Sequence, residues 1–426
     1  MAVALFIFSK IKEYLDDPQH FVPVRMTVVG AAGSGKTVLL KTMVTLIRKM
    51  FKSKRSALVC APTGAAAFVS GGVTIQRMCG MNPSNEDRIT IDSTKKDKLV
   101  EEFLDTIVLF LDERGMIGSK TLGKAERTIA QSTRAGVYAD NGTWGCLPVV
   151  VLIGDDMQLP SAERGSFTLP LGPKKFQAEP PRSMLEARGQ EMFLEAGQLV
   201  MVLGTIKRQD LDETDFAKAL QGLRYDSVED KDYQFLKQFH LQQQHWTEIK
   251  KAKISKKAMY AFSTNQEADN KNLEVLEQTS HASNPVAKCL CNYPTSKHNT
   301  KMGVAKHFNS NTPAGTLLCI GAQVMMAGKN FQPHWGLFNG AVGTVMEIVY
   351  EKGKDPHNGD LPSYVVCSFK GYNGPIWDKK NPTVSDLSTN MSMDCATLSC
   401  YRTLIPCFCP SHHCCNHHHS TFPSLQ

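Results

Sequence analysis

The stretch Gly30-Ala-Ala-Gly-Ser-Gly-Lys36-Thr37 decides the fold of this chain. It fits the pattern G-x-x-x-x-G-K-S/T, and it lies between a β-branched run at 26–29 and apolar residues at helical spacing from Val38. A strand, a glycine-rich turn and a helix in this order bind phosphate, because the turn and the helix N-terminus direct backbone N–H groups at it. The alternative is a chance glycine-rich turn, which the flanking pattern disfavours. The sequence therefore predicts an α/β P-loop nucleotide-binding domain.

Further apolar runs follow at 57–61, 107–111 and 148–153, and each ends in polar or glycine residues. Continuous apolar runs are typical of parallel strands that are covered on both faces. Ligands bind at the carboxyl ends of such strands. Residues 76–100 are polar, and we interpret them as a small irregular insertion. We also expect a helix at 212–224 and a strand that ends near residues 261–265.

The composition fits a globular protein with a polyanionic partner. The chain has 426 residues, which suggests two or three domains, and its net charge is +7 (48 Lys and Arg against 41 Asp and Glu). No apolar run approaches the ~18 residues that span a bilayer. The apolar start at 1–8 leads into an amphipathic pattern, so we expect a helix there, no signal peptide and no membrane association. Seven of the 13 cysteines are scattered over 60–367, and we expect them to be free thiols.

Polar residues at the strand ends suit nucleotide hydrolysis. Asp112 and Glu113 follow the run 107–111, where Asp112 with Thr37 would hold Mg²⁺ and Glu113 would act on the attacking water. Gln158 can position that water, and Arg208 can reach the γ-phosphate. Taken singly, these residues have plain alternatives: a strand-end acidic pair, a polar loop and a surface arginine.

Residues 61–67 (Ala-Pro-Thr-Gly-Ala-Ala-Ala) suit a nucleic-acid backbone. A strand-end hydroxyl at Thr63 with exposed N–H groups beside Gly64 can bind a phosphate without reading a base. The alternative is a tight turn into a helix of small residues.

The order of these motifs closely resembles the petite integration frequency (Pif-like) DNA helicases, which are related to the RecD-like motors of helicase superfamily one. The shared order is the phosphate loop, 61–67, Asp112-Glu113, 154–160 (Gly-Asp-Asp-Met-Gln-Leu-Pro) and Arg208-Gln209. It continues through 263–265, 321–326 and 336–343, so the resemblance covers about residues 20–375.

The resemblance implies two RecA-like domains with parallel sheets and ATP between them, plus a small inserted β-barrel. We place the first RecA-like domain at 1–190, a partial second one at 191–335, the barrel-like insertion at 336–385 and an irregular Cys- and His-rich tail at 386–426. The implied activity is ATP-dependent DNA unwinding, 5′ to 3′, in repair, recombination and telomere maintenance. The implied partners are single-stranded, forked and duplex DNA, and the implied location is the nucleus or the mitochondrion.

The implied site falls on matching positions of this sequence. The catalytic group comprises Glu113, Gln158 and Arg208. The residues expected to bind ATP are Gly30, Ala31, Ala32, Gly33, Ser34, Gly35, Lys36 and Thr37, with Mg²⁺ held by Thr37 and Asp112. The residues expected to contact DNA are Pro62, Thr63, Gly64 and Asn265.

The sequence also departs from the family. No adenine-reading Leu-Asn-x-x-Gln segment precedes Gly30, and Arg114 stands where a Ser is usual. The family's last DNA- and phosphate-contacting segments are missing, and 407–419 is rich in Cys and His, so we expect a truncated or frame-shifted end. Alternatives are a zinc-binding tail, a remnant that binds nucleotide or DNA with impaired turnover, and a P-loop NTPase that is not a helicase. The sequence does not encode the oligomeric state.

Overall fold

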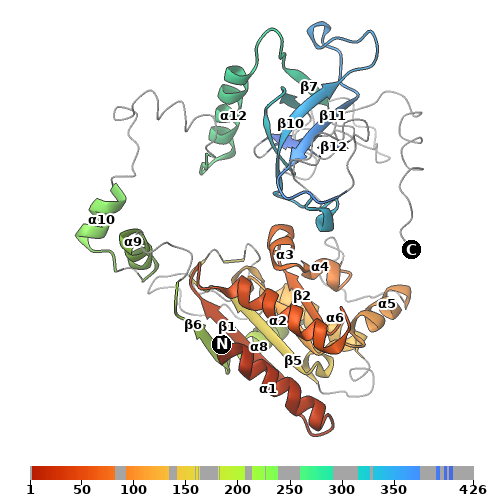
Figure 1. The fold of residues 1–426 in the computed structure, drawn as a ribbon, viewed down its shortest axis with the longest axis vertical. Helices are drawn as coiled ribbons and strands as arrows, with labels where there is room; N and C mark the ends of the chain where they lie inside the picture. The colour runs from red at the N-terminus through yellow and green to blue at the C-terminus, as the bar shows by residue number, and fades with distance from the viewer. Residues whose placement is uncertain are drawn as a thin grey trace. The chain divides into compact units, whose positions relative to one another are not determined.

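The computed structural model divides into two compact units, Met1–Ile254 and Ser255–Gln426 (Figure 1). It describes residues 2–81, 93–133, 142–158, 160, 161, 163, 181, 183–206, 214–225, 227–237, 260–290, 315–326, 330–374, 390–393, 398–400 and 403–405. The boundaries that we placed at 190, 335 and 385 stay predictions.

The first unit is built on a parallel six-stranded sheet. Its order is β3-β2-β4-β5-β1-β6, and every pairing is parallel. The strands are β1 (Val24–Gly30), β2 (Ala57–Ala61), β3 (Val73–Thr74), β4 (Val108–Leu111), β5 (Val149–Gly154) and β6 (Val200–Leu203). The four strands expected from apolar runs are confirmed, whereas β3 and the edge strand β6 were not expected.

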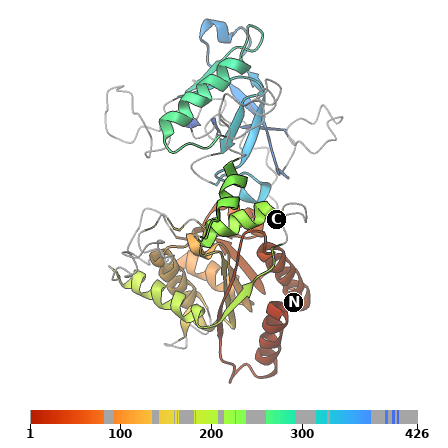
Figure 2. The ribbon, with the colours of Figure 1, turned by 90° about the vertical axis from the view of Figure 1, so that its left-hand side faces the viewer.

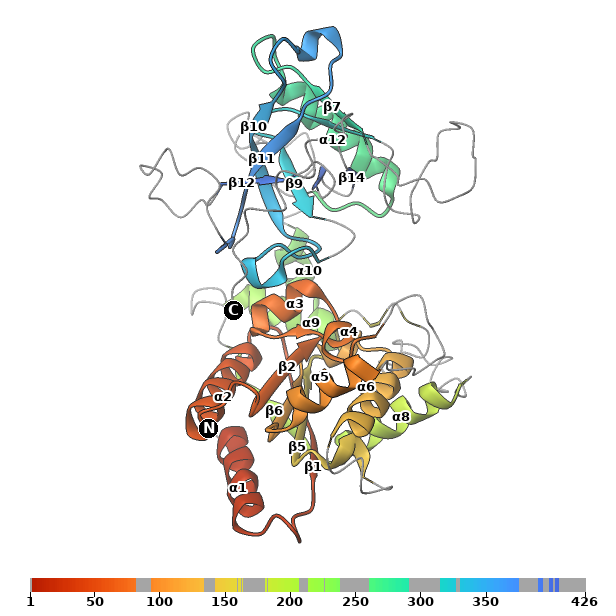
Figure 3. The ribbon, with the colours of Figure 1, turned by 90° about the vertical axis from the view of Figure 1, so that its right-hand side faces the viewer.

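Helices cover both faces of this sheet, as the continuous apolar strands predicted. The helices are α1 (Ala2–Asp16), α2 (Lys36–Phe51), α3 (Gly64–Ser70), α4 (Ile75–Met78), α5 (Ser93–Phe103), α6 (Ser119–Ser132), α8 (Met184–Gly197), α9 (Thr214–Tyr225) and α10 (Asp230–Lys237), with short 3-10 helices η1 (Arg114–Met116) and η2 (Thr143–Cys146). Helices α1 and α2 lie on one side of the sheet, and α6 and α8 lie on the other (Figure 3). Alternate strand residues enter the two cores: Val149 and Val151 face α1 and α2, whereas Val150 and Leu152 face α6 and α8.

The helices of the first unit agree only in part with the sequence-based expectations. Helix α5 occupies the end of the segment 76–100 that we expected to be irregular, because Leu99 and Phe103 bury their side chains in the core beside α6. The helix expected to begin in the apolar segment 1–8 is confirmed as α1, and the helix expected at 212–224 is confirmed as α9. Helices α9 and α10, coloured green in Figure 2, lie against each other.

Helices α6 and α8 cross with their backbones in contact. A Cβ atom at Gly189 would meet the carbonyl oxygen of Ser119 and would lie 3.0 Å from the backbone nitrogen of Gly123. A Cβ atom at Gly123 would in turn lie 2.8 Å from the backbone nitrogen of Gly189. The crossing therefore depends on two facing glycines.

The second unit is mainly antiparallel. Its larger sheet has the order β12-β11-β10-β9-β13-β14, and β7 pairs with β8. Its elements are α12 (Asn265–Thr279), β7 (Ala287–Leu290), β8 (Gly315–Leu318), β9 (Gln323–Met326), η5 (Pro333–Trp335), β10 (Val342–Val349), η6 (Pro356–Asn358), β11 (Tyr364–Phe369), β12 (Asn390–Met393), β13 (Leu398–Cys400) and β14 (Thr403–Ile405). Within the segment 336–385, where we expected a barrel-like insertion, β10 and β11 form an antiparallel pair.

Other expectations for the second unit are wrong or fall on residues outside the described ranges. The strand expected to end near 261–265 is wrong for residues 260–264, because Thr264 and Glu267 form a capping box that starts α12 instead. Strands β12 to β14 fall within the segment that we expected to be irregular, and most of the Cys- and His-rich tail lies outside the described residues. No parallel pairing occurs among the described residues of this unit, so a second RecA-like sheet stays a prediction.

The described residues also bear on the expected thiols, membrane association and zinc site. Cysteines 60, 79, 146, 289, 319 and 367 form no disulfide bond, as expected, and Cys291 lies outside the described residues. Across the described ranges, no helix is long and apolar enough to cross a membrane. Within the same ranges no group of three or more His, Cys, Asp or Glu side chains is placed to hold a metal ion, and the zinc alternative for 407–419 falls outside them.

Candidate nucleotide-binding site

The phosphate loop connects β1 to α2, as the sequence predicted. Gly33 and Gly35 have left-handed backbone φ angles of 83° and 90°, which let the chain wrap from the end of β1 into the helix. Gly35 caps α2, no side chain bonds the first N–H groups of the helix, and its first turn has no acidic residue. The N-terminus of α2 is therefore open to an anion.

Lys36 lies across this loop. Its Nζ donates to the carbonyl oxygens of Gly30 at 2.6 Å and of Ala31 at 3.0 Å. Burial lowers the pKa of Lys36, while the nearby carboxylates of Asp155, Glu113 and Asp112 raise it. The charges of all three acids thus act on the one amine, and the loop holds that amine where a bound phosphate would lie.

Strand β6 fixes the start of the loop. Its residue Leu203 pairs with Gly30, and a Cβ atom at Gly30 would lie 2.9 Å from the Leu203 carbonyl oxygen. The hydroxyl of Ser34 is buried next to this position and has no hydrogen-bond partner among the described residues. Gly30 is therefore required by a strand that lies some 170 residues later in the sequence.

The acidic pair follows β4 at the same edge of the sheet. Asp112 is buried, and burial is the main cause that raises its pKa to about 6. Its Oδ1 accepts a hydrogen bond from the Glu113 backbone N–H at 3.0 Å. Glu113 has a left-handed backbone (φ 52°, ψ 48°), a conformation that costs a non-glycine residue free energy and that clusters at functional sites.

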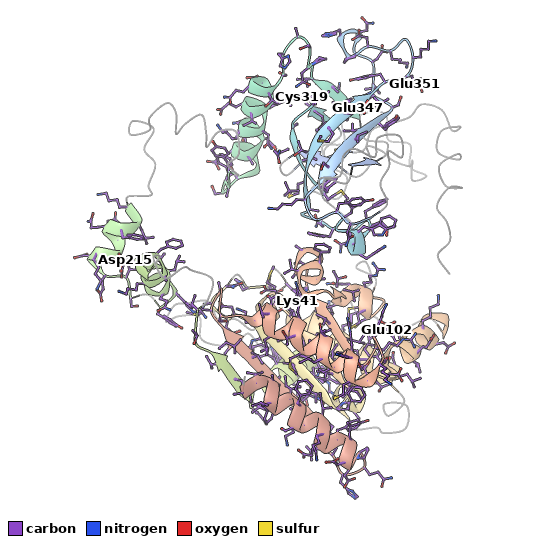
Figure 4. The ribbon with its side chains drawn as sticks, viewed as in Figure 1. Lys41, Glu102, Asp215, Cys319, Glu347 and Glu351 are labelled. Carbon is purple, nitrogen blue, oxygen red and sulfur yellow. The ribbon has the colours of Figure 1, made fainter. Side chains whose placement is uncertain are left out.

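The turn after β5 is organised around Asp155. This carboxylate is 2% exposed, and it accepts from the Met157 backbone N–H at 3.2 Å and from Gln158 Nε2 at 3.3 Å. It also forms a two-pronged ion pair with Arg224 of α9, in which Nη2 lies 2.6 Å from Oδ1 and Nη1 lies 2.8 Å from Oδ2. Asp215, labelled in Figure 4, lies in the first turn of the same helix.

A second arginine holds the same turn. The buried Arg114 donates from Nε and Nη2 to Asp156 at 2.8 and 2.6 Å, and from Nη1 to Thr27 Oγ1 on β1 at 2.9 Å. Its guanidinium lies 4.5 Å from the centre of the Phe193 ring on α8. Arg114, noted in the sequence as a departure, therefore connects the middle of β1 to the segments that follow β4 and β5.

The predicted DNA-contacting residues are placed in part. Thr63 follows β2 and caps α3, because its Oγ1 accepts a hydrogen bond from the Ala66 backbone N–H at 3.2 Å. Gly64 is buried at the start of that helix. This cap is the plain alternative raised for residues 61–67, and it leaves the hydroxyl proton of Thr63 able to donate.

A known protein family resembles part of the first unit. Residues 10–168, which hold the phosphate loop, the acidic pair and the Asp155 turn, match the family model described as PIF1-like helicase. These residues are therefore similar to the PIF1-like helicases.

Individual relatives agree with that assignment. The chain is 32% identical to the ATP-dependent DNA helicase RRM3 of Saccharomyces cerevisiae over 133 residues, which is 31% of this chain and 17% of RRM3. It is 24% identical to the ATP-dependent DNA helicase PIF1 of the same species over 323 residues, which is 75% of this chain and 33% of that protein. The chain thus spans only a third or less of the length of these curated relatives.

Solved PIF1-like structures share the fold. The Pif1 helicase of Candida albicans matches with a TM-score of 0.54 at 20% identity, over 85% of this chain and 74% of that one. Bacteroides Pif1 bound to single-stranded DNA matches with a TM-score of 0.52 at 18% identity, over 93% and 82% of the two chains. These similarities confirm the predicted α/β P-loop fold class.

Two residues that the PIF1-like pattern implied are not placed. Arg208 lies outside the described residues, and of Asn265 only the backbone, at the start of α12, is described. Sequence reasoning in turn missed Arg224 and Leu203. Arg224 reads as an ordinary basic residue in the last turn of an amphipathic helix, and Leu203 ends a short apolar run, Leu199–Leu203, that is detectable in the sequence.

Proposed function

We propose that the chain is the motor portion of an ATP-dependent DNA helicase, which couples ATP hydrolysis to translocation on single-stranded DNA and to duplex unwinding. One observation carries the proposal. The amine of Lys36, the acidic pair Asp112-Glu113 and the Asp155–Gln158 turn come from three strand ends of one sheet, and their charges act on one another. This is the set of groups that phosphoryl transfer requires.

In this proposal the chain binds ATP through its triphosphate. The glycine-rich loop and the uncapped start of α2 bind phosphate oxygens through backbone N–H groups. Lys36 exchanges its hydrogen bonds with the Gly30 and Ala31 carbonyl groups for bonds with the phosphates. Since those carbonyl oxygens are weaker partners than a phosphate, the exchange favours binding.

The residues present fit a magnesium ion. A carboxylate at Asp112 and a hydroxyl at Thr37 are oxygen ligands, and the raised pKa of Asp112 shows a buried carboxylate that a cation would stabilise. The ion would neutralise charge on the transferred phosphoryl group. Glu113 would accept the proton of the attacking water, and Gln158 would orient that water.

We further propose the finer properties that the sequence resemblance implies. Movement is 5′ to 3′, the DNA substrates are single-stranded and forked, and the processes are repair, recombination and telomere maintenance in the nucleus or the mitochondrion. Pro62, Thr63, Gly64 and Asn265 would contact the DNA backbone, and Arg208 would contact the γ-phosphate. The net charge of +7 supports a polyanionic partner.

ATP hydrolysis by the purified chain, with and without single-stranded DNA, tests the proposal. We expect DNA to stimulate hydrolysis, Lys36→Ala to abolish it and Lys41→Ala to leave it within twofold of wild type. Lys41 is a matched control, because it lies exposed on the same helix (Figure 4). Binding of nucleotide or DNA without turnover would favour the impaired remnant, and turnover indifferent to DNA would favour a P-loop NTPase of another kind.

Unwinding assays test the direction of movement. A duplex with a 5′ single-stranded tail should be unwound in the presence of ATP, and the same duplex with a 3′ tail should not. DNA binding should weaken with salt, with log K falling by ~0.7 per phosphate neutralised for each tenfold rise in salt concentration. Equal unwinding of both tails would contradict the proposed direction without affecting the ATPase assignment.

A further inference from the structure

Arg224 lies at the nucleotide site although no recognised motif contains it. It belongs to the last turn of α9, and its guanidinium binds both oxygens of Asp155, at 2.6 and 2.8 Å. The charge of Arg224 also lowers the pKa of Lys36, so the guanidinium is close enough to the phosphate-binding amine to influence it. Arg224 is therefore positioned to act on the same chemistry as Lys36.

The ionised state of the Asp155 carboxylate depends on its ion pair with Arg224. Its side chain is fully buried, and burial alone would raise its pKa because a charged carboxylate loses its hydration. Hydrogen bonds from Arg224 and from the Met157 backbone, with the charges of Arg224 and Lys36, more than offset that effect and lower the pKa. Arg224 thus keeps Asp155 ionised in a buried position.

An ionised Asp155 sets the orientation of the Gln158 side chain. A carboxylate only accepts hydrogen bonds, so the Gln158 amide must direct its NH₂ group at Asp155, as the 3.3 Å contact with Nε2 shows. The carbonyl oxygen of the same amide then points away from Asp155 and is left as an acceptor. A hydrogen-bond acceptor at this position is what orients an attacking water molecule.

We propose that Arg224 is a positioning residue for ATP hydrolysis, which acts through Asp155 to hold the Gln158 amide in the orientation that presents its carbonyl oxygen to the attacking water. The inference rests on the proposed ATPase function. It assigns to α9, outside the residues that match the family model, an indirect part in the geometry of the site, through Asp155.

The competing interpretation is that the ion pair only fastens α9 to the domain. The chain contains a matched pair for separating the two. Arg188 of α8 binds the fully buried Glu126 of α6 with two hydrogen bonds of 2.8 Å. Among the described residues, no hydrogen bond joins this pair to Asp155 or Gln158. Substitution of either arginine breaks a two-pronged pair with a buried carboxylate, but only Arg224 is connected to Gln158.

The experiment compares Arg224→Gln, Arg224→Lys, Gln158→Ala and the double variant Arg224→Gln/Gln158→Ala, with Arg188→Gln as control. We would measure kcat and KM for DNA-stimulated ATP hydrolysis, the Kd of a fluorescent ADP analogue and the Tm of each variant. Because Lys keeps the charge but offers a single prong, Arg224→Lys tests the inference even where Arg224→Gln folds poorly.

Action through Gln158 predicts a specific pattern. Arg224→Gln should lower kcat at least tenfold while KM and the Kd for the ADP analogue stay within about threefold of wild type. The double variant should be no slower than Gln158→Ala alone, and Arg188→Gln should lower Tm but keep kcat within twofold.

Three outcomes would overturn the inference. Additive losses in the double variant would show that Arg224 acts independently of Gln158. If Arg188→Gln and Arg224→Gln lowered kcat to the same extent for the same decrease in Tm, the loss of activity would be a general effect of destabilisation. A wild-type chain that hydrolyses no ATP would overturn the proposed function together with the inference, whereas wild-type hydrolysis with either of the first two results overturns only the inference.

Discussion

At the scale of the residue, the buried carboxylate of Asp112 disfavours the folded protein when no cation is bound. Burial raises the pKa of Asp112 to about 6, whereas its unfolded value is near 3.8. The folded chain therefore binds more protons than the unfolded chain between these values. Its free energy of unfolding falls as the pH rises from about 4 to about 6, and it stays lowered above that range.

Substitution Asp112→Asn should consequently stabilise the nucleotide-free chain while it abolishes hydrolysis. We expect the free energy of unfolding to rise by about 1–3 kcal/mol at pH 8, and the gain to be roughly half as large at pH 5. Urea unfolding at the two pH values measures it. Asp105→Asn, at an exposed position, is the control and should change the free energy of unfolding at neither pH value. A gain that is equal at both pH values would mean that ionisation of Asp112 is not its cause.

At the scale of the element, the glycine contact between α6 and α8 makes a sharper prediction than any surface substitution. Ala at Gly189 should destabilise the chain by about 1–3 kcal/mol, because the added Cβ meets the backbone of α6 and the helices must separate. Ala at Gly197, the last residue of the same helix, has no atom within 4 Å of its Cβ and should be neutral or gain up to ~1 kcal/mol. Equal effects in thermal unfolding would contradict the close crossing.

The elements also show how much the sequence could predict. Strands β1, β2, β4 and β5 are continuous apolar runs, and the phosphate loop and acidic pair are local patterns, so all of these were predictable. The contacts of Arg224 with Asp155 and of Leu203 with Gly30 join residues that are distant in sequence, and no local pattern encodes them. Helix α5 was missed because only Leu99 and Phe103 mark its buried face in a highly charged segment.

At the scale of the whole molecule, the described nucleotide-site residues all lie in the unit Met1–Ile254. A fragment of residues 1–254 should therefore fold and bind an ADP analogue with a Kd within about threefold of the full chain, because the phosphate loop, both cores of the sheet and Arg224 are retained. Fluorescence titration measures the Kd, with the fragment carrying Lys36→Ala as the blank. A folded fragment that does not bind would show that the second unit contributes to nucleotide binding.

The sheet order has a consequence for how the protein is made. Within this sheet β1 is synthesised before the other strands, yet its neighbours β5 and β6 are synthesised last. A nascent chain that ends before residue 200 therefore carries the complete phosphate-loop sequence, but its strand β1 lacks the partner β6. Competence to bind nucleotide should appear late in translation, as a single step when Val200–Leu203 emerges and joins β1.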